Sequence, residues 1–295
     1  MAPAIFDDIA DAAISPYDEL MAYEFLYAAD GTSRSKVSSL LAQHGGLPTM
    51  AMNDLAGLFP DTKMYDEVRG YVESRLGGFS VLVEGTPQFP QSLRAEKNPL
   101  PVFYYRGNLD LIASHRVSVV GTRHPSERGA LAARRIADAL AKRDVTVVAG
   151  LAKGIDTEAM TEAIAQGGHV IGVIGTPIDR YYPAENRLLQ ERVAREHLLI
   201  SQVPIYRYDH QPFETQRFYF PERNITMAAL SEATIIVEAG ETSGTRTQAK
   251  ACLEQGRKLI FLPGVVESTS WAQGYLDKGG QLATSVADAM SMLGL

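Results

Sequence analysis

The chain has 295 residues, a formal net charge of −7 and 45% hydrophobic residues, which is typical of a globular protein of about two domains and excludes a disordered or collagen-like chain. Its one cysteine, Cys252, excludes an intrachain disulfide and a cysteine cluster for zinc, and the six histidines show no ligand spacing, so we expect no metal site. No apolar run approaches the ~18 residues of a membrane span, and the acidic N-terminus lacks the features of a secretory signal. We therefore expect a cytoplasmic protein without membrane contact.

The first 78 residues are expected to form a small helical domain. Helices are predicted at 16–29, 33–44 and 61–76, with Ser33 as an N-cap and Gly45 and Gly46 as a stop. A short strand at 79–83 follows, and a proline-rich connector leads to residues 102–105, which we predict as a strand at the edge of a sheet.

From residue 117 onward, short apolar runs alternate with helical stretches. Strands are expected at 117–120, 145–149, 169–174, 198–201, 233–237 and 258–262, and helices at 127–143, 154–166, 185–196 and 243–255. This alternation is typical of an α/β protein with a parallel sheet covered by helices on both faces. Residues 79–295 are thus predicted to form a doubly wound, mostly parallel α/β domain.

The residues directly after these strands suit a phosphate group. They are Gly121, Thr122 and Arg123; Gly150, Lys153 and Gly154; Gly175 and Thr176; and Ser243, Gly244 and Thr245. In an open α/β sheet the carboxyl ends of the strands form one rim where ligands bind. Glycines let the backbone approach a phosphate, helix N-termini attract anions, and an arginine can donate two parallel hydrogen bonds. For any one of these turns taken alone, a tight turn without a ligand is the alternative interpretation.

The charge distribution allows a basic rim in an acidic protein. Residues 1–80 hold 5 Lys and Arg against 12 Asp and Glu, whereas residues 115–153 hold 8 against 3. Fields of exposed charges decay over about 10 Å in physiological salt, so the local excess can act independently of the total. From charge alone, the favoured explanation of the basic cluster at 115–153 is a solvated helix face.

The common nucleotide-binding and hydrolase motifs do not occur. No GxGxxG follows a predicted strand, and GxxxxGK[ST], GxSxG and HExxH do not occur. A typical dinucleotide site and a Walker-type ATPase are therefore not expected.

Five segments resemble the DprA/Smf family of bacterial DNA-processing proteins. They are VSVVGTR (117–123), AGLAKGID (149–156), GTPIDRYYPAENRLL (175–189), FPERN (220–224) and SGTRTQAKACLEQGR (243–257). The resemblance implies an extended Rossmann-like fold, preceded by a sterile-alpha-motif-like or helix-hairpin-helix-like domain. It also implies single-stranded DNA binding without catalysis or a cofactor, homodimerisation, and transfer of the DNA to a RecA-type recombinase.

By the same resemblance, Arg123 contacts the DNA backbone and Lys153 supports it. The glycines and hydroxyl residues named above shape the pocket, and Arg223, Asn224 and Asn186 complete the expected DNA-binding set. For Asn186 and Asn224, a turn-stabilising role is an equal alternative. The family usually carries a further arginine after FPxRN, where this chain has Ile225.

Residues 203–221 interleave aromatic and cationic side chains. Such a segment can form a surface on which bases stack. We favour the alternative, a long loop whose rings pin it to the core, or a subunit contact.

Two other functions are considered. LOG-type phosphoribohydrolases share a related fold and need a glutamate where this chain has Gln248, and a neutral amide cannot serve as a carboxylate base. A nucleotide sensor that uses the same pocket stays open, because one fold hosts many functions.

Overall fold

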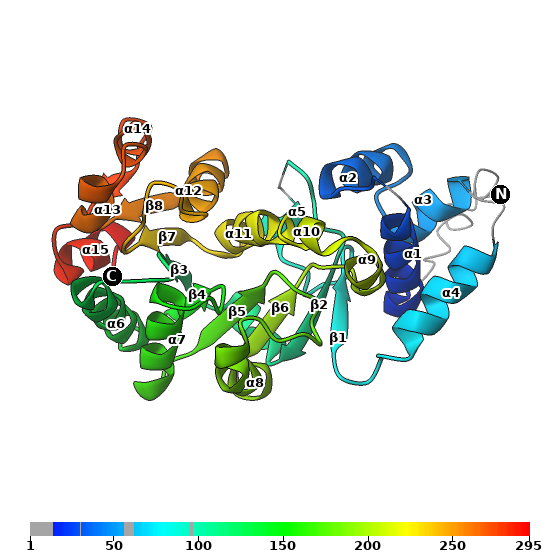
Figure 1. Cartoon of the computed structure of the whole chain (residues 1–295), viewed down its shortest axis with the longest axis horizontal. Helices are drawn as coiled ribbons and strands as arrows, with labels where there is room; N and C mark the ends of the chain where they lie inside the picture. The colour runs from blue at the N-terminus through cyan, green and yellow to red at the C-terminus, as the bar shows by residue number, and fades with distance from the viewer. Residues whose placement is uncertain (1–13, 30, 56–61, 95–96) are drawn as a thin grey trace, which may run out of the picture.

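The computed structural model describes residues 14–29, 31–55, 62–94 and 97–295. The N-terminal stretch, in which we expected no secretory signal, lies mostly outside this part, as does Asp61, the expected start of the third helix. A group of helices comes first and an α/β part follows (Figure 1). Within the described ranges, no helix combines the length and apolar character needed to cross a bilayer.

The N-terminal lobe contains four described helices. They are α1 (Pro16–Ala28), α2 (Arg34–Gln43), α3 (Pro48–Leu55) and α4 (Thr62–Glu73). Ser15 and Ser33 cap α1 and α2 through their side-chain oxygens, and Gly45, at φ 86°, follows α2 in the left-handed region. The predicted helices are present, and α3 is an additional helix.

Helix α1 joins this lobe to the rest of the molecule. It is buried along nearly its whole length and packs against α3, α4, β1 (Ser80–Val83) and α9 (Ile205–His210). The buried Glu24 carboxylate accepts hydrogen bonds from the Tyr104 hydroxyl and from the first two backbone N–H groups of α9, Ile205 at 2.8 Å and Tyr206 at 3.0 Å. Because a carboxylate is favoured at a helix N-terminus, Glu24 fixes α9 against α1.

One sheet of nine strands forms the centre of the described structure. The other strands are β2 (Val102–Gly107), β3 (Arg116–Val120), β4 (Thr146–Ala149), β5 (Val170–Ile174), β6 (Leu198–Ser201), β7 (Ala233–Ile236), β8 (Lys258–Phe261) and β9 (Gln281–Leu282). Their order is β1-β2-β6-β5-β4-β3-β7-β8-β9, parallel from β6 to β9. Strand β2 is antiparallel to both of its neighbours, β1 and β6. The chain winds outward from β3 in one direction and then returns to β7 on the other side of β3. The topological switch point therefore lies between β3 and β7.

Helices cover both faces of this sheet, as predicted. Figure 1 shows α6 (Glu127–Ala141), α7 (Ile155–Ala165) and α8 (Arg187–Glu196) on one side, and α11 (Tyr219–Leu230), α12 (Thr245–Glu254) and α13 (Pro263–Ser268) on the other. The remaining helices are α5 (Gln91–Arg94), α10 (Phe213–Gln216), α14 (Ala272–Leu276), α15 (Val286–Leu293) and the 3-10 turns η1 (Leu109–Ala113) and η2 (Ala184–Asn186). The fold is a doubly wound, Rossmann-like α/β fold.

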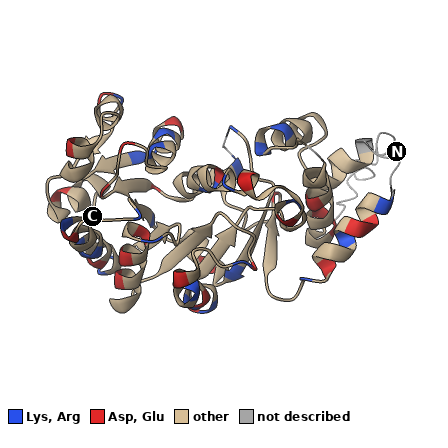
Figure 2. Ribbon diagram, viewed as in Figure 1, with Lys and Arg blue, Asp and Glu red and all other residues tan. Residues whose placement is uncertain are grey.

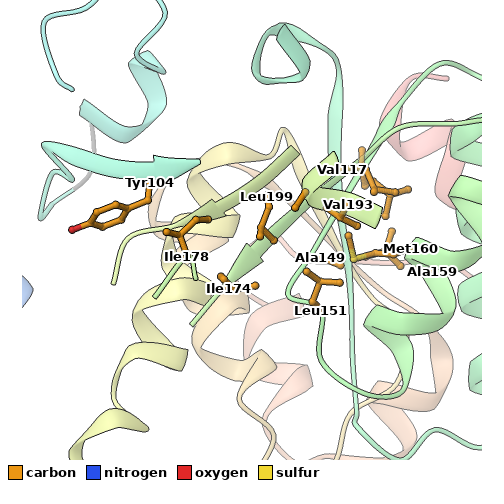
Figure 3. Close-up of a cluster of buried hydrophobic side chains, with 14 of the residues drawn as sticks. Tyr104, Val117, Ala149, Leu151, Ala159, Met160, Ile174, Ile178, Val193 and Leu199 are labelled. Carbon is orange, nitrogen blue, oxygen red and sulfur yellow. The ribbon is translucent and has the colours of Figure 1, made fainter. Parts of the chain in front are cut away.

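Successive side chains of each central strand belong alternately to two hydrophobic clusters, one on each face of the sheet. In β4, Val147 and Ala149 belong to the cluster that also holds Met160 of α7 and Val193 of α8, whereas Val148 belongs to the opposite one. Figure 3 shows Ala149, Met160 and Val193 gathered in the first cluster. Successive side chains of a strand point to opposite faces, so buried strands of this kind are apolar at nearly every position.

Two local predictions are wrong. Strand β2 is not at the edge, because β1 pairs with it and covers it. Residues 203–221 are not a long loop but form α9, α10 and the start of α11. Pro204 and Pro212 are the N-cap residues of α9 and α10, and proline is tolerated at helix starts, where its missing N–H needs no partner.

Candidate nucleic-acid interface

The loops after β3, β4 and β7 are joined to each other at the switch point. The Thr122 N–H donates to the Glu238 carbonyl at 2.7 Å, and the Ile155 N–H donates to the Thr122 carbonyl at 3.2 Å. Gly154 has a φ of 76°, and a Cβ there would lie 2.4 Å from the Thr122 carbonyl oxygen. Only glycine permits this approach, which brings the Arg123 and Lys153 loops together.

Two adjoining pockets occupy this rim. The larger, of about 370 Å³, includes eight expected residues in its wall: Gly121, Thr122, Arg123, Arg223, Asn224, Ser243, Gly244 and Thr245. The smaller, of about 50 Å³, includes five: Arg123, Gly150, Lys153, Gly175 and Arg223. The structure therefore brings Arg123 and Lys153 to one edge of the sheet, as predicted from the strand ends.

Three expected residues lie behind this surface. Asn186 is buried and donates from Nδ2 to the Leu151 carbonyl and the Thr157 hydroxyl, both at 2.8 Å. Thr176 is buried, and its carbonyl accepts from the Ser201 hydroxyl. Together with Gly154, they hold the loops from within the protein.

Arg223 and Asp156 form a buried electrostatic layer beneath the rim. Arg223 Nη1 donates to the carbonyls of Gly150 at 2.5 Å and Val173 at 2.9 Å, and Asp156 Oδ2 accepts from the Gly150 N–H at 2.9 Å. Burial raises the pKa of Asp156, while Arg223 and backbone N–H groups act in the opposite direction. Burial lowers the pKa of Arg223, and the nearby charge of Arg123 adds to this effect. The Asp156 carboxylate acts on the Arg223 pKa in the opposite direction and offsets the charge of Arg223, so Arg123 and Lys153 are the cations left to attract an anion.

An aromatic pair borders the cations. The Phe220 ring packs on Gly175, lies 5.2 Å from the Tyr182 ring between centroids, and has the Arg123 Cζ 5.9 Å from its centroid. Phe220 belongs to residues 203–221, for which we considered base stacking but favoured a structural role. Its position in FPERN, three residues before Arg223, was the available signal.

The second predicted cation is engaged in an ion pair. Lys153 Nζ contacts the Glu185 carboxylate, and the two side chains are 47% and 64% exposed. A hydrogen bond from Lys153 lowers the pKa of Glu185. Exposed pairs of this kind are weak and screened by salt, so a phosphate can replace the Glu185 carboxylate.

The two nearest helix N-termini at the switch point differ. At α6, the Glu238 carboxylate already accepts from the Ser126 N–H at 3.1 Å and from its hydroxyl at 2.7 Å. At α12, Ser243, Gly244 and Thr245 face the larger rim pocket, and the first turn of the helix contains no acidic residue. The α12 end is therefore the one open to an anion.

A larger cavity of about 720 Å³ adjoins the rim at Thr122, His124 and Gly240. It lies between α6, the start of α13 and the start of α15, and much of its wall is apolar, including Leu131 and Ile136. Its wall holds two arginines, Arg128 and Arg135, and two carboxylates, Glu238 and Glu267, so its charges balance. The rim pockets hold Arg123, Arg223 and Lys153 against one carboxylate, the buried Asp156, and are therefore the better phosphate site.

Ile225 does not line either rim pocket. It lines a separate cavity on the other side of α11. Having isoleucine instead of the family's usual arginine at this position therefore removes no cation from the rim pockets.

The fold and the rim define a Rossmann-like α/β protein with a basic site at the strand ends. The family model described as DNA recombination-mediator protein A matches residues 80–294. The chain belongs to this family, which includes proteins named DprA and Smf.

Relatives and solved structures agree with this assignment. The DNA processing protein DprA of Streptococcus pneumoniae is 35% identical over 192 residues, 64% of this chain and 66% of the relative. Protein Smf of Synechocystis is 34% identical over 219 residues, 72% of this chain and 54% of the relative. The matches thus span between about half and two thirds of the length of these curated relatives.

Two solved structures of DprA proteins resemble this fold. The Streptococcus pneumoniae protein has a TM-score of 0.74 at 26% identity, covering 94% of this chain and 98% of that one. The Helicobacter pylori protein, whose structure concerns its single-stranded DNA binding mode, has a TM-score of 0.62 at 26% identity, covering 73% and 95%.

Proposed function

We propose that this protein binds single-stranded DNA along the strand-end rim. Arg123 and Lys153 would hold phosphates, and Phe220 and Tyr182 would stack against bases. One observation carries the proposal: cations from the loops after β3 and β4 share a pocket with an aromatic pair. The relative from Helicobacter pylori, described as binding single-stranded DNA, supports it.

The site favours a single strand over a duplex for a physical reason. A ring in a pocket can stack only on a base whose face is free, and such stacking contributes about 1–3 kcal/mol per base. In a duplex the base faces are covered by neighbouring pairs, so only the phosphate contacts would remain.

We further propose that the protein acts as a homodimer and passes the strand to a RecA-type recombinase. The family description as a recombination mediator supports the second part. Joining two rims would lengthen the binding path and raise affinity through effective concentration.

The proposal includes no catalysis. Gln248 stands where a LOG-type hydrolase needs a glutamate, and the two nearby carboxylates are engaged elsewhere: Glu238 with Ser126, and Glu241 with Ser270, whose N–H lies 2.8 Å away. Incubation with AMP should release no adenine, and robust turnover would contradict this part of the proposal.

A nucleotide sensor is a second candidate, favoured by the open N-terminus of α12 and by the buried Gln248 Oε1, which has no hydrogen-bond partner in the described structure. A mononucleotide that co-purifies with the protein would support it. Competition of that nucleotide with oligo-dT would show that both ligands use the rim.

The test is the affinity for fluorescent oligo-dT by anisotropy, with Arg123→Glu against the wild type. A matched control is Arg195→Glu, because Arg195 is 71% exposed in the last turn of α8, directly before β6 begins. Arg195 therefore lies toward the amino ends of the parallel strands, away from the rim. Its substitution changes the charge by the same amount as Arg123→Glu.

Arg123→Glu should weaken binding by at least about tenfold, since one charge-assisted contact is lost and a repulsive charge is added. Arg195→Glu should bind like the wild type. Equal affinity for Arg123→Glu and the wild type would remove the proposed site.

A further inference from the structure

A separate cavity of about 550 Å³ lies between the N-terminal lobe and the α/β part. Its walls come from the first turn of α2, from Lys97 and Asn98, from α11 and α12, and from Arg257 before β8. Figure 2 shows basic residues on both α2 and α12, which border the cavity from the two lobes. The DNA-binding proposal does not involve this cavity.

Its wall holds more positive than negative charge. Arg34, Lys97, Lys250 and Arg257 face two carboxylates, Glu222 and Glu254. Burial raises the pKa of Glu222, and the nearby charge of Arg34 acts in the opposite direction. Lys250 Nζ lies 3.8 Å from the Glu254 carboxylate. Among the described residues, no carboxylate pairs with Lys97 or Arg257.

The two arginines of this wall differ in their hydrogen bonds. Arg34 is buried, and its guanidinium is held by the Asn98 carbonyl at 3.0 Å and the Thr226 hydroxyl at 3.1 Å. The buried Nε of Arg257 has no hydrogen-bond acceptor within the described ranges. An N–H buried without a partner is costly, and a shift of the Arg257 side chain toward a ligand oxygen in the cavity would relieve that cost.

We propose that this cavity binds a phosphate group, held by Lys97 and Arg257 with Arg34 and Lys250 beside them. Hydroxyl groups of Ser35, Ser92 and Thr247 line the same wall and can donate further hydrogen bonds. Fixed guanidinium donors and lysine ammonium groups are the side chains that proteins use for phosphate. The neighbouring first turn of α2 contains no acidic residue, so its helix dipole is not neutralised there.

The cavity and the larger rim pocket are bordered by the same two helices, α11 and α12. Asn224 at the rim donates to the Gly244 carbonyl at 3.0 Å, and the following residues on each helix, Ile225 and Thr247, already line the cavity. From Thr245 to Lys250 the helix rises by about 8 Å. The phosphate can therefore belong to a strand that leaves the rim, or to a free phosphorylated compound.

The test uses inorganic pyrophosphate and isothermal titration calorimetry, in a background of Arg123→Glu that disables the rim. The background protein should bind pyrophosphate, and adding Lys97→Ala and Lys250→Ala should weaken that binding by at least about tenfold. The matched control adds Lys142→Ala and Lys278→Ala, two exposed lysines outside the cavity. All four lysines are exposed, so these changes should leave folding intact.

Two results would overturn the proposal: no pyrophosphate binding by the Arg123→Glu protein, or equal binding after the two cavity lysines are removed. This test does not require DNA binding at the rim, so it can succeed where the proposed function fails.

Oligo-dT of increasing length identifies the source of the phosphate, with Arg123 intact. If Lys97→Ala with Lys250→Ala weakens only the longer oligonucleotides, the cavity holds a phosphate of the bound strand. If the affinity is unchanged at every length while pyrophosphate binding is lost, the cavity takes a free phosphorylated compound.

Discussion

Gly150→Ala should destabilise the protein by displacing Arg223. A Cβ at Gly150 would lie 1.6 Å from Nη1 of Arg223, so the guanidinium must leave its place. It would lose its hydrogen bonds to the Gly150 and Val173 carbonyls. Each hydrogen bond from a charged group contributes about 1.5–3 kcal/mol, and a guanidinium that reaches water recovers part of its hydration. We therefore expect the free energy of unfolding to fall by about 3 kcal/mol.

Urea unfolding of a double-mutant cycle checks this reasoning. In an Arg223→Ala background, Gly150→Ala should cost much less, because no guanidinium remains to displace. The control is Gly70→Ala in α4, where a Cβ meets nothing within 4 Å and the change should stabilise the helix by up to about 1 kcal/mol. If the effects of Gly150→Ala and Arg223→Ala add to within about 0.5 kcal/mol, the proposed displacement is refuted.

Three further predictions concern other parts of the structure. Burial raises the pKa of Glu24 to about 7, so the folded chain holds this proton more tightly than the unfolded chain. The free energy of unfolding should then fall by about 3 kcal/mol as the pH rises from about 4.5 to about 7. Glu24→Gln should flatten this pH dependence in urea titrations, and an unchanged pH profile in the variant would contradict the assignment to Glu24. Phe220→Ala should weaken oligo-dT binding by about 1–3 kcal/mol in anisotropy, with little change in the salt dependence, because stacking involves no phosphate; a flatter salt dependence would argue against stacking. Gly129→Ala would place a Cβ 1.8 Å from the Glu238 carboxylate and break its contact with the start of α6. The lost cap costs about 0.5–2 kcal/mol, which offsets the helix propensity gained, so thermal unfolding should show no gain like that of Gly70→Ala; an equal gain in both variants would speak against the contact.

The rim was predictable because topology alone defines it. Once strands and helices alternate, the carboxyl ends of parallel strands meet at one edge, so Arg123 and Lys153 could be placed together without any knowledge of packing. The short, continuous apolar runs likewise predict the sheet, since strands that are covered on both faces are apolar at nearly every position.

Other features depend on contacts between distant segments. Arg223 was expected at the rim surface, but carbonyls of β5 and of the loop after β4 bind its guanidinium beneath it. Phe220 reaches Tyr182 only because α11 begins where a loop was predicted. The prolines of that segment indicate both loops and helix starts, and the sequence pattern alone does not distinguish them.

Photo-crosslinking tests the central claim most directly. Oligo-dT carrying 5-iodouracil would be irradiated with the wild-type protein, and the crosslinked peptides would be identified by mass spectrometry. We predict crosslinks at Phe220 and Tyr182, the two rings that border Arg123 at the rim. Crosslinks confined to peptides from the opposite edge of the sheet, such as the end of α8, would contradict a strand bound at the carboxyl ends of β3, β4 and β5.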